Sequence, residues 1–264
     1  MFVPLGRLAG APCVQLTSPL TRAGNHLYDW MWAFRHDRPR RPARVQHQPS
    51  MVPWLAEFPL LDALTLPLAT TPRLFADFRG SHEDIFGQHF TRAELARFCT
   101  ALVASSSSFR TRLSRAADDV GHRSVVVNVR RGDYYEHDFL QAAYGLDIEG
   151  YVGASLRALR AQGVPADEIV IVSDDLDWCL QHLPAVVDLP LRPLAQRSSP
   201  LDDLAALAAA RTVILANSTF SFWGAHIGAA LHPDTLVLAP PYHFIDDGVP
   251  DKKRFDPTWQ VITP

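Results

Sequence analysis

The feature that most constrains the fold is a repeated alternation of short apolar runs and helical patterns after residue 123. Apolar, β-branched runs of strand length recur as SVVVNV, EIVIVS, TVILA and TLVLA. Between them lie segments with helical spacing, such as residues 151–162, in which Val152, Leu156 and Leu159 share one face. Strands that alternate with helices in this way form a parallel sheet with helices on both faces. An α/β fold is therefore predicted for this part.

Two further helices carry explicit start signals. Ser199 is a predicted N-cap, followed by Pro200 at the first helical position and Asp202 where an acid favours the helix dipole. In the first half, Thr91 and Glu94 form the pattern of a capping box. The predicted buried stripe of this second helix consists of Leu95, Phe98, Cys99 and Leu102.

The first half of the chain is less regular and is predicted to form a second, smaller α/β lobe. CVQL and ARVQH resemble strands around a helix at residues 25–34. We place the boundary between the lobes near Val120, which gives an N-terminal lobe of residues 1–120 and a C-terminal lobe of residues 121–264. The proline-rich, basic stretch FRHDRPRRPARV is typical of an exposed loop.

Charge and cysteine content narrow the classes of partner. The formal net charge of the 264 residues is −3, so nothing attracts the chain as a whole to nucleic acid, and any anion must be recognised by a local cluster. Cys13, Cys99 and Cys179 lie far apart without metal-site spacing, which favours core thiols in a reducing compartment. No apolar run approaches the roughly 20 residues that span a bilayer. We therefore expect a cytoplasmic protein.

Polar residues follow three of the predicted strands. The stretches are NVRRGDYYEHD after the first strand, SDD at residues 173–175 after the second, and NSTFSFWG at residues 217–224 after a later one. Ligands of open parallel sheets bind at the carboxyl ends of the strands, so these stretches are the candidate site.

Two of these stretches suit a diphosphate. Guanidinium groups of Arg130 and Arg131 match phosphate oxygens bidentately. The stretch NSTFS leads into a helix whose N-terminus offers free N–H groups and a positive dipole end. Spacing alone leaves an alternative open, in which the arginines form ion pairs with Asp133 or Glu136 on a solvated turn. The chain has no GxGxxG or Walker motif, so the dinucleotide and P-loop classes lose support.

In this order, the three stretches resemble the motifs of the alpha-1,2-fucosyltransferase family, glycosyltransferase family eleven. NVRRGDY, VSDDLDWC and DDLAALAAARTVILANSTFSFWGA carry the resemblance, together with AGNHLYDWMWAF near the N-terminus. It implies a GT-B-like fold of two Rossmann-like lobes with a cleft between them. It also implies GDP-fucose as donor, a saccharide acceptor, inversion at the anomeric carbon, and neither metal nor cofactor. The C-terminal lobe would bind the GDP-sugar and the N-terminal lobe the acceptor.

The resemblance assigns roles to individual residues. Arg130 would clamp the leaving β-phosphate, and Arg131 would support it or brace the loop. Asp203 would read guanine, whose N1–H and amino group suit one carboxylate; the alternative is an exposed acid in the first turn of a helix. Gly24 and Asn25 would approach from the first lobe. The residues expected to line the diphosphate are Asn217, Ser218, Thr219 and Ser221, whereas Phe220, Phe222 and Trp223 are expected to be packing aromatics.

Inversion needs a base that takes the proton of the acceptor hydroxyl. The acids closest to the arginines in sequence are Asp133, Glu136 and Asp138. We favour Asp138 as the base and expect Asp133 to pair with an arginine; His137 is a further candidate.

One departure from the family pattern leaves the donor open. Asn128 stands where the family has a histidine, and it can hydrogen-bond a phosphate but cannot become cationic. Two alternatives to a fucosyltransferase therefore remain: a transferase of the same architecture that uses another nucleotide sugar, and a catalytically silent nucleotide-sugar-binding protein. Peripheral membrane association is also left open.

Overall fold

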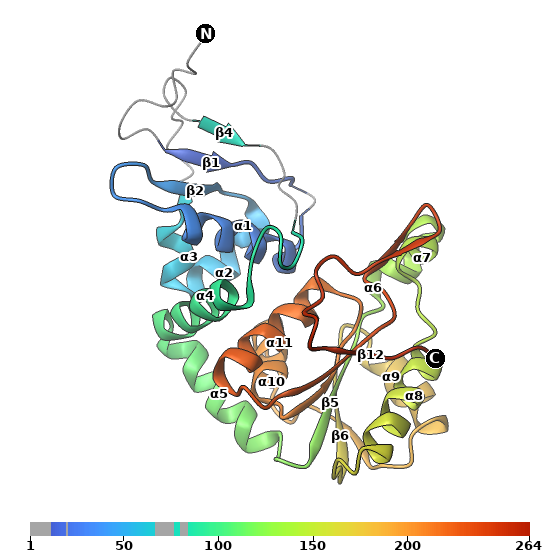
Figure 1. Ribbon diagram of the computed structural model, residues 1–264. Helices are drawn as coiled ribbons and strands as arrows, with labels where there is room; N and C mark the ends of the chain where they lie inside the picture. The colour runs from blue at the N-terminus through green and yellow to red at the C-terminus, as the bar shows by residue number, and fades with distance from the viewer. Residues whose placement is uncertain (1–11, 20, 67–76, 80–83) are drawn as a thin grey trace. The chain divides into compact units, whose positions relative to one another are not determined.

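The chain forms two compact units, Met1–Arg110 and Thr111–Pro264. The computed structural model describes residues 12–19, 21–66, 77–79 and 84–264 (Figure 1). The division falls within helix α5 (Ser107–Asp119), whereas the sequence placed it near Val120, just after that helix. Within the described ranges, no helix is both long and apolar enough to cross a membrane.

The first unit contains a parallel four-stranded sheet in the order β3-β2-β1-β4. Its strands are β1 (Cys13–Gln15), β2 (Ala43–Gln46), β3 (Thr65–Leu66) and β4 (Asp77–Arg79). Its helices are α1 (Ala23–His36), a 3-10 turn (Pro49–Met51), α2 (Val52–Glu57), α3 (Pro59–Ala63) and α4 (Arg92–Ser105). The strands predicted from CVQL and ARVQH and the helix between them are confirmed.

The start of α4 follows the predicted local chemistry. The Thr91 side chain accepts a hydrogen bond from the Glu94 backbone N–H, and the Glu94 carboxylate accepts one from the Thr91 N–H at 2.9 Å. This reciprocal pair satisfies N–H groups that a helix otherwise leaves unpaired. The predicted apolar stripe of this helix is buried.

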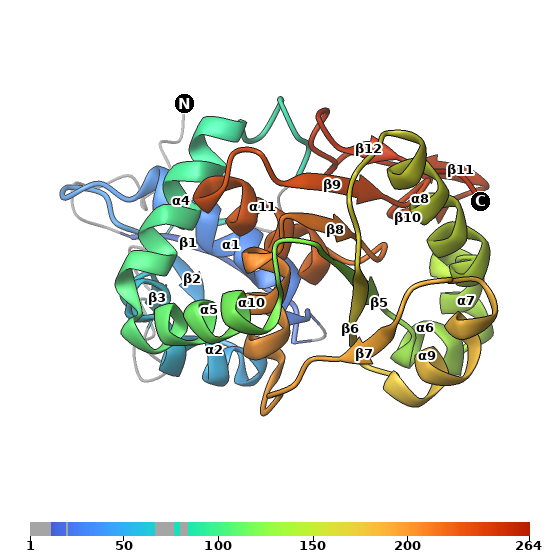
Figure 2. The same ribbon diagram turned by 90° about the horizontal axis from the view of Figure 1, so that it is seen from below.

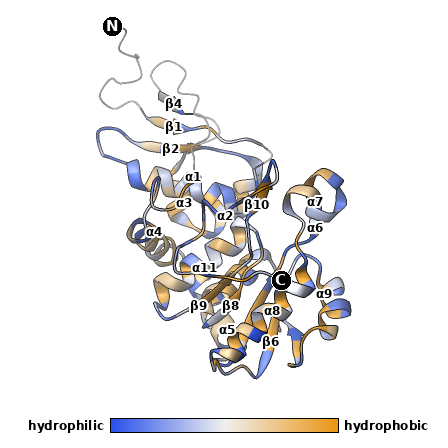
Figure 3. Cartoon of the chain, turned by 45° about the vertical axis from the view of Figure 1, so that its right-hand side comes forward, coloured by the Kyte–Doolittle hydropathy of each residue, from blue (hydrophilic) through white to orange (hydrophobic). Residues whose placement is uncertain are grey.

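The second unit is built on a parallel six-stranded sheet in the order β12-β9-β8-β5-β6-β7 (Figure 2). Its strands are β5 (Ser124–Val129), β6 (Glu168–Ser173), β7 (Leu191–Pro193), β8 (Thr212–Ile214), β9 (Leu236–Ala239) and β12 (Gln260–Val261). A separate antiparallel hairpin consists of β10 (Phe244–Asp246) and β11 (Val249–Asp251). All six residues of β5 are buried, and the strands of the sheet are largely hydrophobic in colour (Figure 3). The predicted α/β fold with parallel sheets is confirmed.

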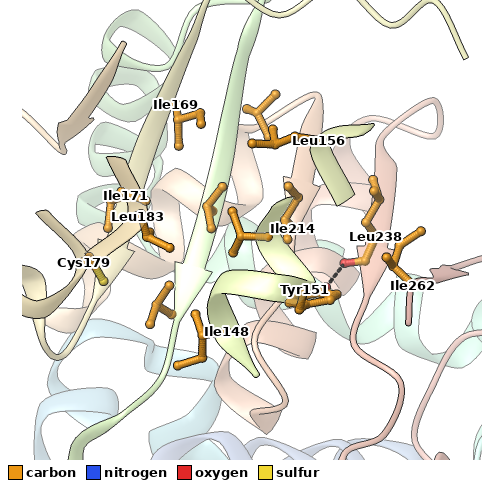
Figure 4. Close-up of a cluster of buried hydrophobic side chains, with 14 of the residues drawn as sticks. Ile148, Tyr151, Leu156, Ile169, Ile171, Cys179, Leu183, Ile214, Leu238 and Ile262 are labelled. Carbon is orange, nitrogen blue, oxygen red and sulfur yellow. Dashed lines mark hydrogen bonds between the residues drawn. The ribbon is translucent and has the colours of Figure 1, made fainter. Parts of the chain in front are cut away.

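Helices cover both faces of this sheet. Its long helices are α5, α8 (Ile148–Ala161), α10 (Pro200–Ala209) and α11 (Thr219–Leu231), and the shorter ones are α6 (Gly132–Glu136), α7 (Asp138–Tyr144), α9 (Leu176–His182) and a 3-10 turn (Leu183–Ala185). On one face, Tyr151 and Leu156 of α8 pack on Ile169, Ile214 and Leu238 of the strands (Figure 4). The Tyr151 hydroxyl donates to the Leu238 carbonyl at 3.1 Å. α10 and α11 pack together and α10 contacts β5 and β6 on the other face.

Two features of the second unit were not predicted. The stretch after β5, interpreted as a turn, folds into the short helices α6 and α7, and hairpin β10–β11 lies beside α7 (Figure 1). The three cysteines are buried as predicted, and no disulfide joins them.

Candidate active site

The three polar stretches lie at the carboxyl ends of neighbouring strands in the second sheet. In the parallel pair β5–β8, Val127 is opposite Ile214, so Arg130 and Asn217 each follow the last paired residue of their strand by three positions. In the pair β5–β6, Val129 is opposite Ser173, so the next residue, Arg130, is level with Asp174. Because all these strands are parallel, their carboxyl ends gather the stretches in one place, as the sequence predicts.

Arg130 is held by two carboxylates. Its Nη1 donates to Asp174 Oδ2 at 2.6 Å, and its Nη2 forms an ion pair with Asp133. The guanidinium carbon also lies 5.3 Å from the centroid of the Tyr134 ring. These bonds use two of the five N–H groups of a guanidinium, and the Arg130 side chain is 29% exposed. The two carboxylates therefore orient the guanidinium and leave some of its N–H groups for a further oxygen ligand. Their negative charges nevertheless oppose the binding of an anion.

Arg131 is packed between two aromatic rings. Its guanidinium carbon lies 4.4 Å from the centroid of Tyr135 and 4.2 Å from that of Trp178. Its Nε donates to Asp175 at 3.0 Å, and its backbone N–H donates to Asp174 at 2.9 Å. This environment joins α6 to α9 and favours the bracing role over direct phosphate contact.

In the SDD stretch, both aspartates bind the arginines, and Asp175 also caps a helix. Both oxygens of Asp174 accept hydrogen bonds, from Arg130 and from the Arg131 backbone. Asp175 caps α9 by accepting from the Trp178 N–H at 3.2 Å. Within the ranges that the structure describes, no cluster of three or more His, Cys, Asp or Glu residues could hold a metal ion.

The candidate bases differ in environment. Asp133 lies in the first turn of α6 and forms the predicted ion pair with Arg130. Glu136 ends α6, His137 separates the two helices, and Asp138 begins α7; all three are exposed. Asp138 is followed by Phe139, which is 71% exposed and whose ring stacks on His137 at 5.7 Å between centroids.

The N-terminus of α11 is not capped by the side chain of its own N-cap residue. Ser218 is the N-cap residue, and its side chain makes no cap hydrogen bond. Asn217 is 2% exposed and donates from Nδ2 to the Tyr144 carbonyl at 2.7 Å, which ties α11 to the end of α7. Thr219 opens the first turn, whereas the Ser221 hydroxyl is fully buried and accepts from the Ala216 N–H at 3.1 Å. Ser218 and Thr219 are thus better placed for a ligand than Ser221.

Asn128 has a structural contact. Its side chain is 8% exposed and donates from Nδ2 to the Val172 carbonyl on β6 at 2.9 Å. Residue 128 therefore joins two neighbouring strands directly before the arginines. Phe222 and Trp223 are fully buried, as expected of packing aromatics.

Asp203 is buried and forms a bidentate pair. Arg197 donates from Nε and Nη2 to the two carboxylate oxygens, both at 2.7 Å, and Asp203 is only 4% exposed. Burial raises the pKa of Asp203, and the hydrogen bonds and charge of Arg197 oppose this. The alternative of an exposed acid is wrong, and a guanine base would share this carboxylate with Arg197.

The neighbouring Asp202 anchors the start of α10. It accepts hydrogen bonds from the Ser198 backbone and hydroxyl and from the Ser199 N–H, and it pairs with Arg112 at 2.5 Å. Burial raises the pKa of Asp202, but the hydrogen bonds from Ser198, Arg112 and Ser199 outweigh burial and lower it to about 2. The predicted cap Ser199 is confirmed.

The sequence analysis did not predict the aromatic rings that pack beside Arg130. Tyr134 and Tyr144 stack at 4.5 Å between centroids, and Tyr144 in turn contacts His243 and Phe244. Burial raises the pKa of Tyr134, so its hydroxyl stays protonated. The pair YY after RRGD was the available signal, because aromatic rings next to arginines often pack on them. Arg197, the partner of Asp203, gave no signal.

Gly24 and Asn25 lie in the first unit. Both belong to the first turn of α1, where the Asn25 N–H donates to the Arg22 carbonyl at 3.0 Å, and Gly24 is buried. Their predicted approach to the donor stays a prediction.

Arginines and a helix N-terminus at the carboxyl ends of parallel strands are features that phosphate-binding sites of α/β proteins share. The profile of Glycosyl transferase family 11 matches residues 101–263, more than half of the chain. The protein therefore belongs to this family, as the motifs predicted.

Curated relatives are similar over part of their length. An alpha-1,2-colitosyltransferase of Escherichia coli is 30% identical over 105 residues, which are 39% of this chain and 35% of that protein. Galactoside alpha-(1,2)-fucosyltransferase 1 of Mus musculus is 29% identical over 147 residues, 53% of this chain and 37% of that protein. The alignments thus span little more than a third of each of these relatives.

Solved structures show weaker likeness. NodZ alpha-1,6-fucosyltransferase, soaked with GDP-fucose, gives a TM-score of 0.44 at 15% identity and covers 82% of this chain and 92% of that chain. POFUT1 in complex with GDP gives a TM-score of 0.40 at 14% identity, with coverage of 70% and 56%.

Proposed function

We propose that this protein is an inverting, metal-independent fucosyltransferase that moves L-fucose from GDP-fucose to a hydroxyl of a saccharide, with the 2-hydroxyl of a galactoside as the acceptor group. The observation that carries the proposal is that Arg130 follows β5 and the N-terminus of α11 follows β8, the neighbouring parallel strand, in a chain that belongs to family 11. A departing diphosphate needs cations and N–H donors there, because no metal takes up its charge in this proposal.

The proposed chemistry is a single in-line displacement. The acceptor oxygen attacks the anomeric carbon as the bond to the β-phosphate oxygen breaks, and GDP leaves with the electron pair. Arg130 and the first-turn N–H groups of α11 stabilise the charge that develops on the phosphate. The Asp138 carboxylate takes the proton of the acceptor hydroxyl. The exposed ring of the next residue, Phe139, is the apolar surface that we propose for the acceptor ring.

The environment of Asp138 supports its role over that of Asp133. A base must be free to accept a proton, and Asp133 is already an ion-pair partner of Arg130. Asp138 is exposed at the start of α7, and α7 is joined to the α11 N-terminus through Asn217 and Tyr144. The helix that begins with Asp138 is thus attached at its other end to the start of α11.

A second candidate is a transferase that uses another nucleotide sugar. It is favoured by the similarity to an alpha-1,2-colitosyltransferase and by Asn128, which here bonds a strand carbonyl. A binding screen with GDP, GDP-fucose, GDP-colitose, GDP-mannose and UDP-galactose separates the candidates. Tight binding of GDP-fucose, followed by transfer to a galactoside in the presence of EDTA, is the expected result. Preference for GDP-colitose, GDP-mannose or UDP-galactose favours the second candidate. No binding of any GDP compound refutes the first candidate, and no binding of any compound in the screen refutes both.

The same screen addresses the catalytically silent alternative. Binding of GDP-fucose with neither hydrolysis nor transfer across a panel of galactosides would support that reading. Loss of transfer in EDTA that Mg²⁺ or Mn²⁺ restores would contradict metal independence and redirect attention to the two acids of the SDD stretch.

A further inference from the structure

Four flat side chains form a continuous stack next to Arg130. The guanidinium of Arg131 contacts the ring of Tyr135, at 4.4 Å from its centroid, and the ring of Trp178, at 4.2 Å. Trp178 also stacks on His182, with 4.6 Å between the ring centroids and 11° between the planes. We call these four residues the Arg131 stack. It joins the start of α6 to the whole length of α9.

Both ends of the Arg131 stack are attached to the start of α8. The Tyr135 hydroxyl donates to the Leu146 carbonyl at 2.8 Å and accepts from the Leu146 N–H at 3.1 Å. At the other end, His182 Nδ1 lies 3.1 Å from Oε1 of Glu149 in the first turn of α8. The stack therefore closes on one short segment of the chain, and it cannot shift without breaking contacts at one of its ends.

The Arg131 stack reaches Arg130 through a single carboxylate. The Arg131 backbone N–H donates to Asp174 Oδ1 at 2.9 Å, and Asp174 Oδ2 accepts from Arg130 Nη1 at 2.6 Å. The backbone of one arginine thus fixes the acid that holds the guanidinium of the other. A partly exposed ion pair is usually weak because both side chains must be ordered to form it. Here the backbone bond already orders one of the two.

Gly132 brings the backbone close to the same carboxylate. Its φ is +22°, and a Cβ at this position would lie 2.5 Å from Asp174 Oδ2. Glycine permits both the positive φ and the close approach. Asp174 is therefore in contact with the chain directly after Arg131, so a displacement of Arg131 would move the carboxylate that orients Arg130.

A simpler interpretation is that the stack only fastens α6 to α9, because a cation between aromatic rings stabilises a fold. That interpretation explains the contacts of the Arg131 side chain. It does not explain why the backbone of Arg131 and the guanidinium of Arg130 share the two oxygens of Asp174. The two interpretations differ in what they predict for ligand binding by Arg130.

We propose that Trp178 is a positioning residue for the donor substrate: it fixes Arg131 and thereby, through Asp174, orients the guanidinium of Arg130 toward the diphosphate. The inference rests on the proposed function, in which Arg130 binds the leaving phosphate. Trp178 acts without touching the nucleotide. Donors that are oriented before the ligand arrives stabilise its charge without the cost of ordering them during binding.

The test is calorimetric titration of the full chain with GDP, at a temperature at which thermal unfolding shows every variant to be folded. Trp178→Leu should weaken GDP binding about three- to tenfold, because the aromatic face on Arg131 is lost. Trp178→Phe keeps an aromatic face and should bind GDP within about twofold of the parent. Tyr135→Leu removes the other ring from Arg131 and should act like Trp178→Leu, so it carries the test if Trp178→Leu does not fold.

Two further variants separate a positioning role from a structural one. In the Arg130→Ala background, Trp178→Leu should have little further effect on GDP binding, because the proposed route ends at Arg130. Leu183→Ala is the control for lost stability. Leu183 follows α9 and is fully buried in the hydrophobic cluster, so this change opens a cavity near the stack but leaves both rings on Arg131. It should leave GDP affinity close to that of the parent.

The outcomes distinguish this inference from the proposed function. A parent that does not bind GDP refutes the proposed function, and the inference with it. A parent that binds GDP, with unchanged affinity in Trp178→Leu and Tyr135→Leu, refutes the inference alone. Losses that simply add in the Arg130→Ala, Trp178→Leu double variant also overturn it, because Trp178 would then act by a route that does not include Arg130. Equal losses in Leu183→Ala and Trp178→Leu would reduce the effect to general destabilisation.

Discussion

Replacing Arg130 by alanine should weaken GDP binding about 10- to 30-fold. A charge-assisted hydrogen bond contributes about 1.5–3 kcal/mol, and the 29% exposure of Arg130 places the expected loss in the lower half of that range. About 1.5–2 kcal/mol corresponds to this change in Kd, since about 1.4 kcal/mol is a factor of ten. The substitution also removes the cation that offsets the charges of Asp133 and Asp174, which adds repulsion toward the phosphate in the same direction.

Calorimetric titration with GDP measures the effect, and two other variants sharpen it. Arg130→Lys keeps the positive charge but loses the planar pair of N–H donors of the guanidinium, so its GDP affinity should lie between those of the parent and Arg130→Ala. Arg123→Ala is the matched control, because Arg123 precedes the same strand and forms an exposed ion pair with Asp167. Thermal unfolding of each variant checks that the unit stays folded.

The reasoning is refuted if Arg130→Ala binds GDP as tightly as the parent. It is also refuted if Arg123→Ala weakens GDP binding to the same extent, since the loss would then reflect general charge and not a contact at the strand end.

Further predictions concern the acids of the second unit. Asp138→Asn should lower kcat about 10²- to 10⁴-fold with little change in GDP affinity, while Glu136→Gln stays near the parent in steady-state kinetics; the reverse ranking would move the base to Glu136. Asp203→Asn should lower the free energy of unfolding by about 1–3 kcal/mol in denaturant titrations, because Arg197 loses the charge of its buried carboxylate partner. It should also narrow the preference for GDP over ADP if the acid reads guanine. Burial raises the pKa of Asp202, but its hydrogen bonds lower it to about 2. The contribution of the Asp202 carboxylate to the free energy of unfolding is therefore present above pH 4 and is lost as the pH falls toward 2. In Asp202→Asn, the free energy of unfolding should fall by about 2 kcal/mol less between pH 4 and pH 2 than it does in the parent. An acid unfolding curve identical to that of the parent would contradict the assignment.

Local sequence signals were sufficient for much of the fold. The helix N-caps at Thr91 and Ser199 could each be predicted from residues within one helical turn, and the structure contains both. The parallel sheet followed from strand and helix periods that alternate over a long stretch. Placement of the arginines and the α11 N-terminus at one edge followed from the same alternation, because parallel strands share the direction of their carboxyl ends.

Pairing across long distances was beyond the reach of these signals. Nothing in the sequence indicates that Asn128 bonds the Val172 carbonyl or that Arg197 turns back to Asp203. Helices α6 and α7 were missed because each is shorter than two helical periods over which a pattern could repeat. The sequence left open whether the arginines after β5 pair with acids on a solvated turn. Acids and rings fix them, and these come from α6, from Asp174 after β6, and from α9.

The bond from Asn217 to the Tyr144 carbonyl has a consequence for mutational scans of this protein. Substitution of Asn217 by alanine releases the end of α7 as well as the start of α11, so a single change should reduce turnover and nucleotide affinity together. Variants along this edge will therefore show epistasis, and their individual effects will not sum to the effect of the combination.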